Sequence, residues 1–84
     1  MKREEILARI INVFKEEFEI ENPGVDDDLR EKYEFDSIDA IELLREIESM
    51  LGSELSQDEK KMAMDIRTIN QICDYVETVA MARA

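Results

Sequence analysis

Apolar residues recur at intervals of three and four positions through most of this chain, the spacing that places them on one face of a helix. The first such stripe predicts a helix from Arg3 to about Phe18, and the last predicts a helix that begins after Thr68 and frays from Ala82 to Ala84. No segment alternates apolar and polar residues as a strand does. Three capping boxes mark helix starts, namely Asp36 with Asp39, Ser56 with Glu59, and Thr68 with Gln71. The chain is therefore predicted to be an all-α single domain.

The helix predicted to follow Asp36 has two unlike faces. Its core side is a broad apolar arc made of Ala40, Leu43, Leu44, Ile47, Met50 and Leu51. Ile38 and Ile41 project from the opposite side, where a purely structural helix is normally polar. Two isoleucines are therefore expected to face water, and Gly52 is expected to end the helix with a left-handed cap.

The first helical position after Asp36 is Ser37. A hydroxyl at this position lies at the helix tip, within reach of another protein and beside the positive end of the helix dipole. Because Asp36 already serves as the predicted cap, Ser37 has no evident structural task. We therefore single out Ser37 as a candidate functional residue.

The segment from Glu19 to Phe35 lacks helical periodicity, and Asn22-Pro23-Gly24 is a strong turn signal. It is predicted to be a long loop that can include a short helical turn from Asp28 to Tyr33. The run Asp26-Asp27-Asp28 does not continue as a calcium-binding loop, because the acid or amide, the glycine and the glutamate required later are all missing. We expect a solvated acidic loop instead.

Beyond Gly52, a short third helix is predicted from Ser56 through about Met64. Three apolar residues are predicted to return to the core in this region: Leu55, Met62 and Ile66. Cys73 lies inside the apolar stripe of the last helix, so it is predicted to be a small buried hydrophobe rather than a reactive thiol.

The composition excludes several classes of function. A formal net charge of −11 argues against a nucleic-acid partner and favours basic protein surfaces. With no histidine and one cysteine, the usual zinc sites, Cys–His or Ser–His catalytic pairs and disulfide frameworks are excluded within one chain, so neither a metal site nor an enzyme is expected. At 84 residues the chain is too small for a deep substrate cavity. Acidic residues interrupt the apolar positions of the N-terminal segment, so we expect no signal peptide or membrane insertion, and a cytoplasmic monomer.

Two segments resemble acyl carrier proteins. The run Asp36-Ser37-Ile38-Asp39-Ala40-Ile41-Glu42-Leu43 resembles the start of the second helix in that family, and the segment from Ile66 to Val76 is similar to its last-helix segment. The resemblance implies a four-helix bundle of acyl-carrier type, with three main helices, a short third helix and a long loop between helices one and two. It also implies that a phosphopantetheinyl transferase uses coenzyme A and Mg²⁺ to attach 4′-phosphopantetheine covalently to Ser37.

A carrier of this kind would hold acyl groups as thioesters and deliver them to enzymes of fatty-acid, polyketide or specialised lipid biosynthesis. We expect those acyl-loading and acyl-processing enzymes to have basic docking surfaces. The predicted docking set is Asp36, Ile38, Asp39, Ile41, Glu42, Arg45 and Glu48. Three residues depart from the family pattern, namely Glu34 in place of a common glycine, the bulky Phe35, and Arg45 on the docking face. These departures predict a specialised carrier.

Two alternatives stay open at this point. An aminoacyl or peptidyl carrier would share the fold and the arm, but the Gly pair that often precedes the serine in such carriers is missing here, and Asp36 favours the acyl type. The other alternative is an acidic helical adaptor that binds basic partners and never uses Ser37 covalently.

Overall fold

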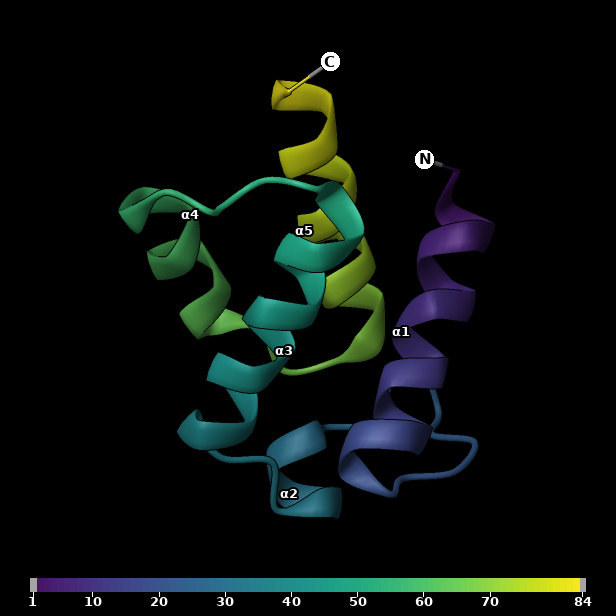
Figure 1. Ribbon diagram of the computed structural model, residues 1–84. Coiled ribbons are helices and arrows are strands. Elements are labelled where there is room, and N and C mark those ends of the chain that lie inside the picture. Colours follow the sequence, from purple (N-terminus) through teal and green to yellow (C-terminus); the bar gives the residue numbers. More distant parts are fainter. Residues whose placement is uncertain (1, 84) are drawn as a thin grey trace.

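The computed structural model describes residues 2–83, and these form five α-helices and one 3-10 turn (Figure 1). The elements are α1 (Arg3–Phe18), α2 (Leu29–Tyr33), α3 (Ser37–Leu51), α4 (Gln57–Met62), η1 (Ala63–Asp65) and α5 (Ile69–Ala82). Within these residues there is no strand. The all-α helical bundle predicted from the sequence is confirmed, and the short helical turn in the long loop is α2.

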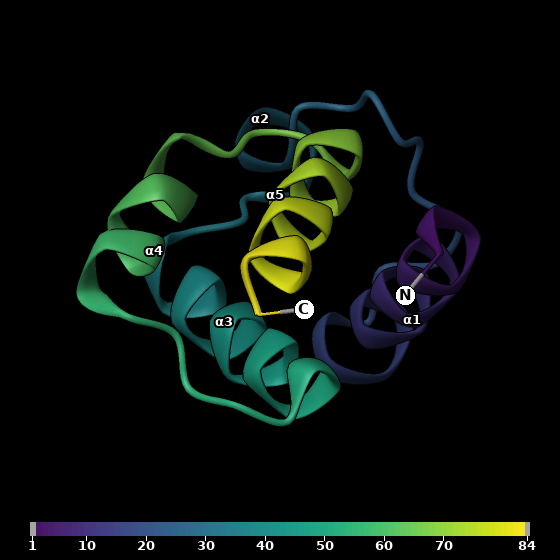
Figure 2. The same cartoon turned by 90° about the horizontal axis from the view of Figure 1, so that it is seen from above.

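The helices α3 and α5 form the middle of the bundle, with α1 on one side of them and α4 on the other (Figures 1 and 2). α1 runs antiparallel to α3 and α5, while α2 lies across the end of the bundle where α1 stops and α3 begins. The elements differ in how many residues they bury. α1 contributes four buried residues and α5 six, whereas α4 and η1 contribute none.

Local capping chemistry explains where the helices start and stop. All three predicted capping boxes are present, at the starts of α3, α4 and α5. Gly52 ends α3 in the left-handed conformation, with φ of 68°, as predicted. Asp28 caps α2 by accepting hydrogen bonds from the backbone N–H groups of Arg30 and Glu31, both 3.0 Å long.

The acidic loop is solvated as predicted, with Asp26 exposed and Asp27 and Asp28 half-buried, but its aspartates also make specific hydrogen bonds. Asp26 accepts a hydrogen bond of 2.6 Å from the side-chain amide of Asn70 at the start of α5. Asp27 accepts hydrogen bonds from the Gly24 N–H (2.9 Å), the Lys32 ammonium (3.0 Å) and the Tyr33 hydroxyl (3.0 Å). Chiefly because of Lys32, the pKa of Asp27 lies below its ordinary value. The three aspartates therefore tie the loop to itself and to α5.

The link between α2 and α3 contains two of the residues that depart from the family pattern. Glu34 has a φ of 55°, the left-handed region that glycine adopts without steric cost. Phe35 packs its ring against Phe14 and Phe18, with centroid distances of 5.7 and 5.4 Å. The large side chain at position 35 thus fastens the start of α3 onto α1.

Two predictions near α4 and at the C-terminus need correction. Met62 is 54% exposed and not in the core, because none of the residues of α4 is buried. Leu55 is buried as predicted, and Ile66 is half-buried against the core. Arg83 was predicted to fray with its neighbours, yet its side chain makes several hydrogen bonds to the α3–α4 link and to α4. Ala84, also predicted to fray, lies outside the described residues.

Candidate functional site

Ser37 is the first residue of α3, and it is exposed. The Asp36 carboxylate caps the helix by accepting 3.0 Å hydrogen bonds from the N–H groups of Ile38 and Asp39. In return, the Asp39 carboxylate accepts a 3.1 Å hydrogen bond from the Asp36 N–H. These reciprocal bonds fix the first turn of the helix, so the Ser37 hydroxyl is presented at a rigid tip.

The outer face of α3 displays the predicted apolar pair. Ile38 is 74% exposed and Ile41 is 56% exposed, which confirms that both face water. Arg45 is exposed on the same helix and forms no ion pair with any of residues 2–83. An apolar pair with a cation one turn further on is an unusual surface for a chain with a net charge of −11.

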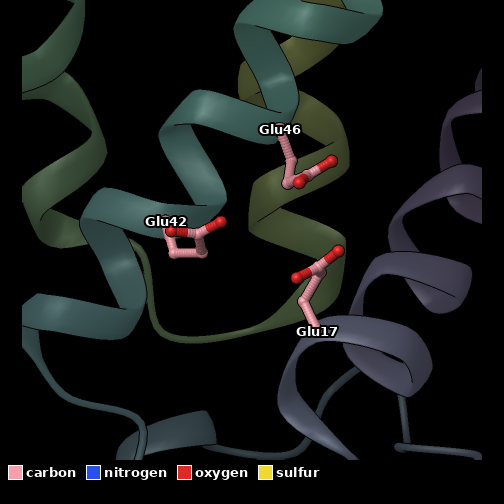
Figure 3. A group of neighbouring side chains, drawn as sticks. All are labelled: Glu17, Glu42 and Glu46. Carbon is pink, nitrogen blue, oxygen red and sulfur yellow. The ribbon is translucent and has the colours of Figure 1, made fainter.

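The acidic members of the predicted docking set do not all face the same way. The Glu48 carboxylate accepts a 2.8 Å hydrogen bond from the Leu55 N–H, and so holds the link between α3 and α4. Glu42 lies near Glu46 of α3 and Glu17 of α1, and one carboxylate oxygen from each of the three is within 4.8 Å of the others (Figure 3). The three carboxylates concentrate negative charge between α1 and α3, and we assign no metal to them.

A small cavity lies beside Ser37, between α3 and η1. Its volume is about 40 Å³. Most of its lining is apolar and comes from Phe35, Ala40, Leu43, Leu44, Ile47, Ala63 and Ile66. Asp36 and Ser37 also line it, as do Arg30 and Met64. An apolar space therefore opens next to the candidate serine.

No local pattern in the sequence predicts this cavity. The only signal for it was the width of the apolar arc on α3, which includes the half-buried Ala40 and Leu44 in addition to the buried Leu43 and Ile47. A flank that α1 and α5 leave partly uncovered needs another cover. At the cavity, η1 and Ile66 provide that cover, and the fit is incomplete.

Comparison with known proteins identifies the family. The family model described as a phosphopantetheine attachment site matches residues 8–76. The chain belongs to the acyl carrier protein family. It is 35% identical over 78 residues to an acyl carrier protein of Rubrobacter xylanophilus, which covers 90% of this chain and 93% of that protein. Acyl carrier protein 2 of Ralstonia nicotianae is 32% identical over 84 residues, covering 98% of this chain and all of the relative. No solved structure gave a significant match.

Membership of the acyl carrier protein family implies the prosthetic group 4′-phosphopantetheine. Acyl carrier proteins are carriers and not catalysts, which agrees with the expectation drawn from the composition. No helix within residues 2–83 has the length and apolar character needed to cross a membrane.

Proposed function

We propose that Ser37 is the attachment residue for 4′-phosphopantetheine, and that this acyl carrier protein holds acyl groups on the arm for delivery to partner enzymes. The observation that carries the proposal is the position of Ser37, an exposed hydroxyl at a rigid helix tip that also lines an apolar cavity. The site fits the group on two counts. The hydroxyl is free to form a phosphodiester, and an apolar space lies next to the point from which the arm would start.

The roles of the chain's own residues follow from this geometry. When a phosphopantetheinyl transferase acts on coenzyme A, the Ser37 oxygen would form a bond to the phosphorus that bears the pantetheine. The P–O bond of the pyrophosphate would break, adenosine 3′,5′-bisphosphate would leave, and the hydroxyl proton would pass to a base of the transferase or to water. Asp36 and Asp39 hold the helix tip in place through their reciprocal hydrogen bonds. The arm, once attached, supplies a thiol that holds the acyl group as a thioester.

The cavity favours an acyl cargo over an aminoacyl cargo. A saturated chain gains about 0.8 kcal/mol for each methylene that leaves water. A charged amino group gains nothing from an apolar space and loses hydration there. We therefore favour an acyl carrier over an aminoacyl or peptidyl carrier, and both over an adaptor that never uses Ser37.

The docking face is expected to select the partners. Burying Ile38 or Ile41 against an enzyme would contribute roughly 1.5 to 3 kcal/mol, and Asp39 and Glu42 would orient a basic-rimmed surface. Arg45 adds a cation to this face, so a matching partner should present an acidic group there. We propose on this basis that the protein is a specialised cytoplasmic carrier, acting as a monomer in fatty-acid, polyketide or other lipid biosynthesis.

Intact-mass measurement tests the attachment site. The purified chain is incubated with coenzyme A, Mg²⁺ and a broad-specificity phosphopantetheinyl transferase, as wild type, Ser37→Ala and Ser49→Ala. Ser49 is the matched control, because it is another exposed serine of α3. We expect the wild type and Ser49→Ala to gain the mass of one phosphopantetheine, and Ser37→Ala to gain none. An unmodified wild type, or a modified Ser37→Ala, would overturn the proposal.

Replacement of a general fatty-acid carrier tests the specialised role. In a reconstituted fatty-acid synthase, the modified protein should support much slower turnover than the general carrier, because Arg45 places positive charge against a basic docking surface. Arg45→Glu should recover part of the rate. Full efficiency of the wild type in this assay would rule out the specialised role while leaving Ser37 as the attachment site.

A further inference from the structure

We propose that arginine contacts fasten one wall of the cavity and so limit this carrier to sheltering a short acyl chain. The wall in question is the segment of α4 and η1, residues 57–65, which we call the α4–η1 wall. The inference rests on the proposed function, because it assumes an acyl group on an arm at Ser37. It adds the class of cargo and the residues that select it.

The α4–η1 wall has no buried side chain of its own. Apolar packing in the interior is what normally fixes a helix in place, and here that contribution is small. Ala63 and Met64 of the wall line the cavity, and Met64 is 57% exposed. The position of the wall therefore depends largely on polar contacts, which are made at its two ends and by Tyr75, whose hydroxyl donates a 2.7 Å hydrogen bond to the Glu59 carbonyl.

Arg83 holds the N-terminal end of the wall. Its guanidinium forms a two-pronged ion pair with the Glu59 carboxylate, with both N···O distances 2.8 Å. The same side chain donates to the Ser53 hydroxyl at 2.6 Å and to the Glu54 carbonyl at 2.7 Å. The arginine side chain is 26% exposed and that of Glu59 is 19% exposed, so water screens this contact less than a fully exposed pair. We call this set of contacts the Arg83 clamp.

Two further arginines hold the C-terminal end of the wall at one backbone atom. The carbonyl oxygen of Met64 accepts a 3.2 Å hydrogen bond from Arg30 of α2 and a 3.3 Å hydrogen bond from Arg67. Arg30 itself lines the cavity together with Ser37. This contact therefore joins α2 to η1 across the space into which a chain attached at Ser37 would enter.

The size of the fastened cavity sets the length of chain that fits. A space of about 40 Å³ accepts roughly three water-sized groups. The inner side of the cavity is formed by Leu43 and Ile47, which are 4% and 0% exposed and packed in the core. Phe35 packs against Phe14 and Phe18, and Ile66 packs against the core, so we expect a longer chain to gain room chiefly by movement of the α4–η1 wall away from α3. That movement would stretch the Arg83 clamp, the Arg30 contact, or both.

Melting of a series of acyl forms tests the inference. The wild type and the double variant Arg30→Gln/Arg83→Gln are loaded at Ser37 with acyl-phosphopantetheine of about 2 to about 12 carbons, and each melting midpoint is compared with that of the form bearing the free thiol. In the wild type, the midpoint should stop rising at about four carbons. In the double variant, it should continue to rise with longer chains, by about 3 to 6 °C for each added methylene that is buried.

Lys61→Gln is the matched control, because it removes one positive charge from an exposed residue of the same wall. The dependence of its melting midpoint on acyl chain length should match that of the wild type. A wild-type midpoint that rises steadily to the longest chain overturns the inference without any variant. The inference is also overturned if the melting midpoint of the fully loaded double variant depends on chain length as that of the wild type does. Arg83→Lys, which retains the charge but loses the two-pronged contact, replaces the double variant if the latter does not fold.

The two proposals fail in different ways. A chain that takes up no phosphopantetheine at Ser37 contradicts the proposed function at the mass measurement. A chain that loads normally, but whose melting profile does not respond to the arginine substitutions, contradicts only the inference about the wall.

Discussion

The two sides of the α3–α5 pair are held by different kinds of interaction. On one side, α1 packs four buried side chains against the core, among them Phe14 and Ile10, which are fully buried. On the other side, the α4–η1 wall buries none and is held by polar contacts to Arg83, Arg30 and Tyr75. Separating close-packed apolar side chains costs much free energy, whereas the partners of a partly exposed polar contact can form hydrogen bonds to water instead. We conclude that packing against α1 contributes most of the stability of the fold, whereas the α4–η1 wall can move at a smaller cost in free energy.

Truncation of a core residue should show the contrast most strongly. Phe14→Ala removes a fully buried ring that also contacts Phe18 and Phe35, so it should lower the free energy of unfolding by about 3 to 5 kcal/mol. Met62→Ala on the α4–η1 wall should change it by less than about 0.5 kcal/mol. Urea denaturation measures both. If the two variants were equally destabilised, the contrast between the sides would be wrong.

Acid should weaken the wall through Glu59. Its pKa is lowered from 4.5 to about 2, first by the hydrogen bonds from Arg83 and then by the Ser56 N–H. Because the folded-state pKa lies below the ordinary value, this contribution to stability is present above pH 4.5 and is lost as the pH falls towards 2. Glu59→Gln should therefore melt below the wild type at neutral pH.

The comparison with Glu59→Gln is needed because protonation of the other carboxylates also changes the net charge of −11. The melting midpoints of the wild type and of Glu59→Gln should converge between pH 4.5 and 2. A constant difference across that range would show that the Glu59 carboxylate is not stabilised by Arg83.

Tyr75 connects the two sides, since its ring is buried in the core and its hydroxyl donates a 2.7 Å hydrogen bond to the Glu59 carbonyl. Tyr75→Phe should cost about 1 kcal/mol or less in the free energy of unfolding, because that carbonyl also accepts from the Ala63 N–H. Amide hydrogen exchange should accelerate in α4 and stay unchanged in α1. Equal acceleration in both helices would contradict a separately held wall.

The same variant has a second readout at alkaline pH. Burial, followed by the nearby Glu59, raises the pKa of Tyr75 from 10.0 to about 12. The wild type should therefore lose stability as the pH rises from 10 to 12, and Tyr75→Phe should lack that loss.

The smallest expected effect is at Glu34, between α2 and α3. Its φ of 55° is costly for a residue with a Cβ atom, so Glu34→Gly should raise the free energy of unfolding by up to about 1 kcal/mol. Glu21→Gly is the control, because Glu21 does not have a positive φ and gains nothing there. Thermal melting measures both, and a destabilised Glu34→Gly would show that the glutamate side chain makes a contribution larger than its backbone strain.

Local features of this fold could be predicted from the sequence, and features that depend on distant residues could not. Helix α1 has its predicted bounds, and the three capping boxes are read from residues three positions apart. The exposure of Ile38 and Ile41 followed from helical periodicity alone. The Arg83 clamp joins residues 24 to 30 positions apart, and the bond from Asn70 to Asp26 spans 44 positions. No local pattern encodes such pairs.

The residues that depart from the family pattern also divide into what the sequence predicts and what only the structure explains. The sequence marks Glu34 and Phe35 as departures, but only the structure gives the reasons, namely a left-handed backbone and a cluster of three phenylalanine rings. Arg45 remains without a partner within residues 2–83. The cavity beside Ser37 likewise depends on how α3 and η1 are spaced, which the amphipathic pattern of either element does not specify.

The hydrogen bonds at the tip of α3 have a consequence for how cargo would reach an enzyme. The N–H groups of Ile38 and Asp39 already donate to Asp36, and that of Ala40 donates to the Asp36 carbonyl. A phosphodiester on Ser37 would find these three donors taken, so none of them would hold its phosphate. The arm would then behave as a tether, and the effective concentration of its thioester at a docked active site would depend on its length and flexibility.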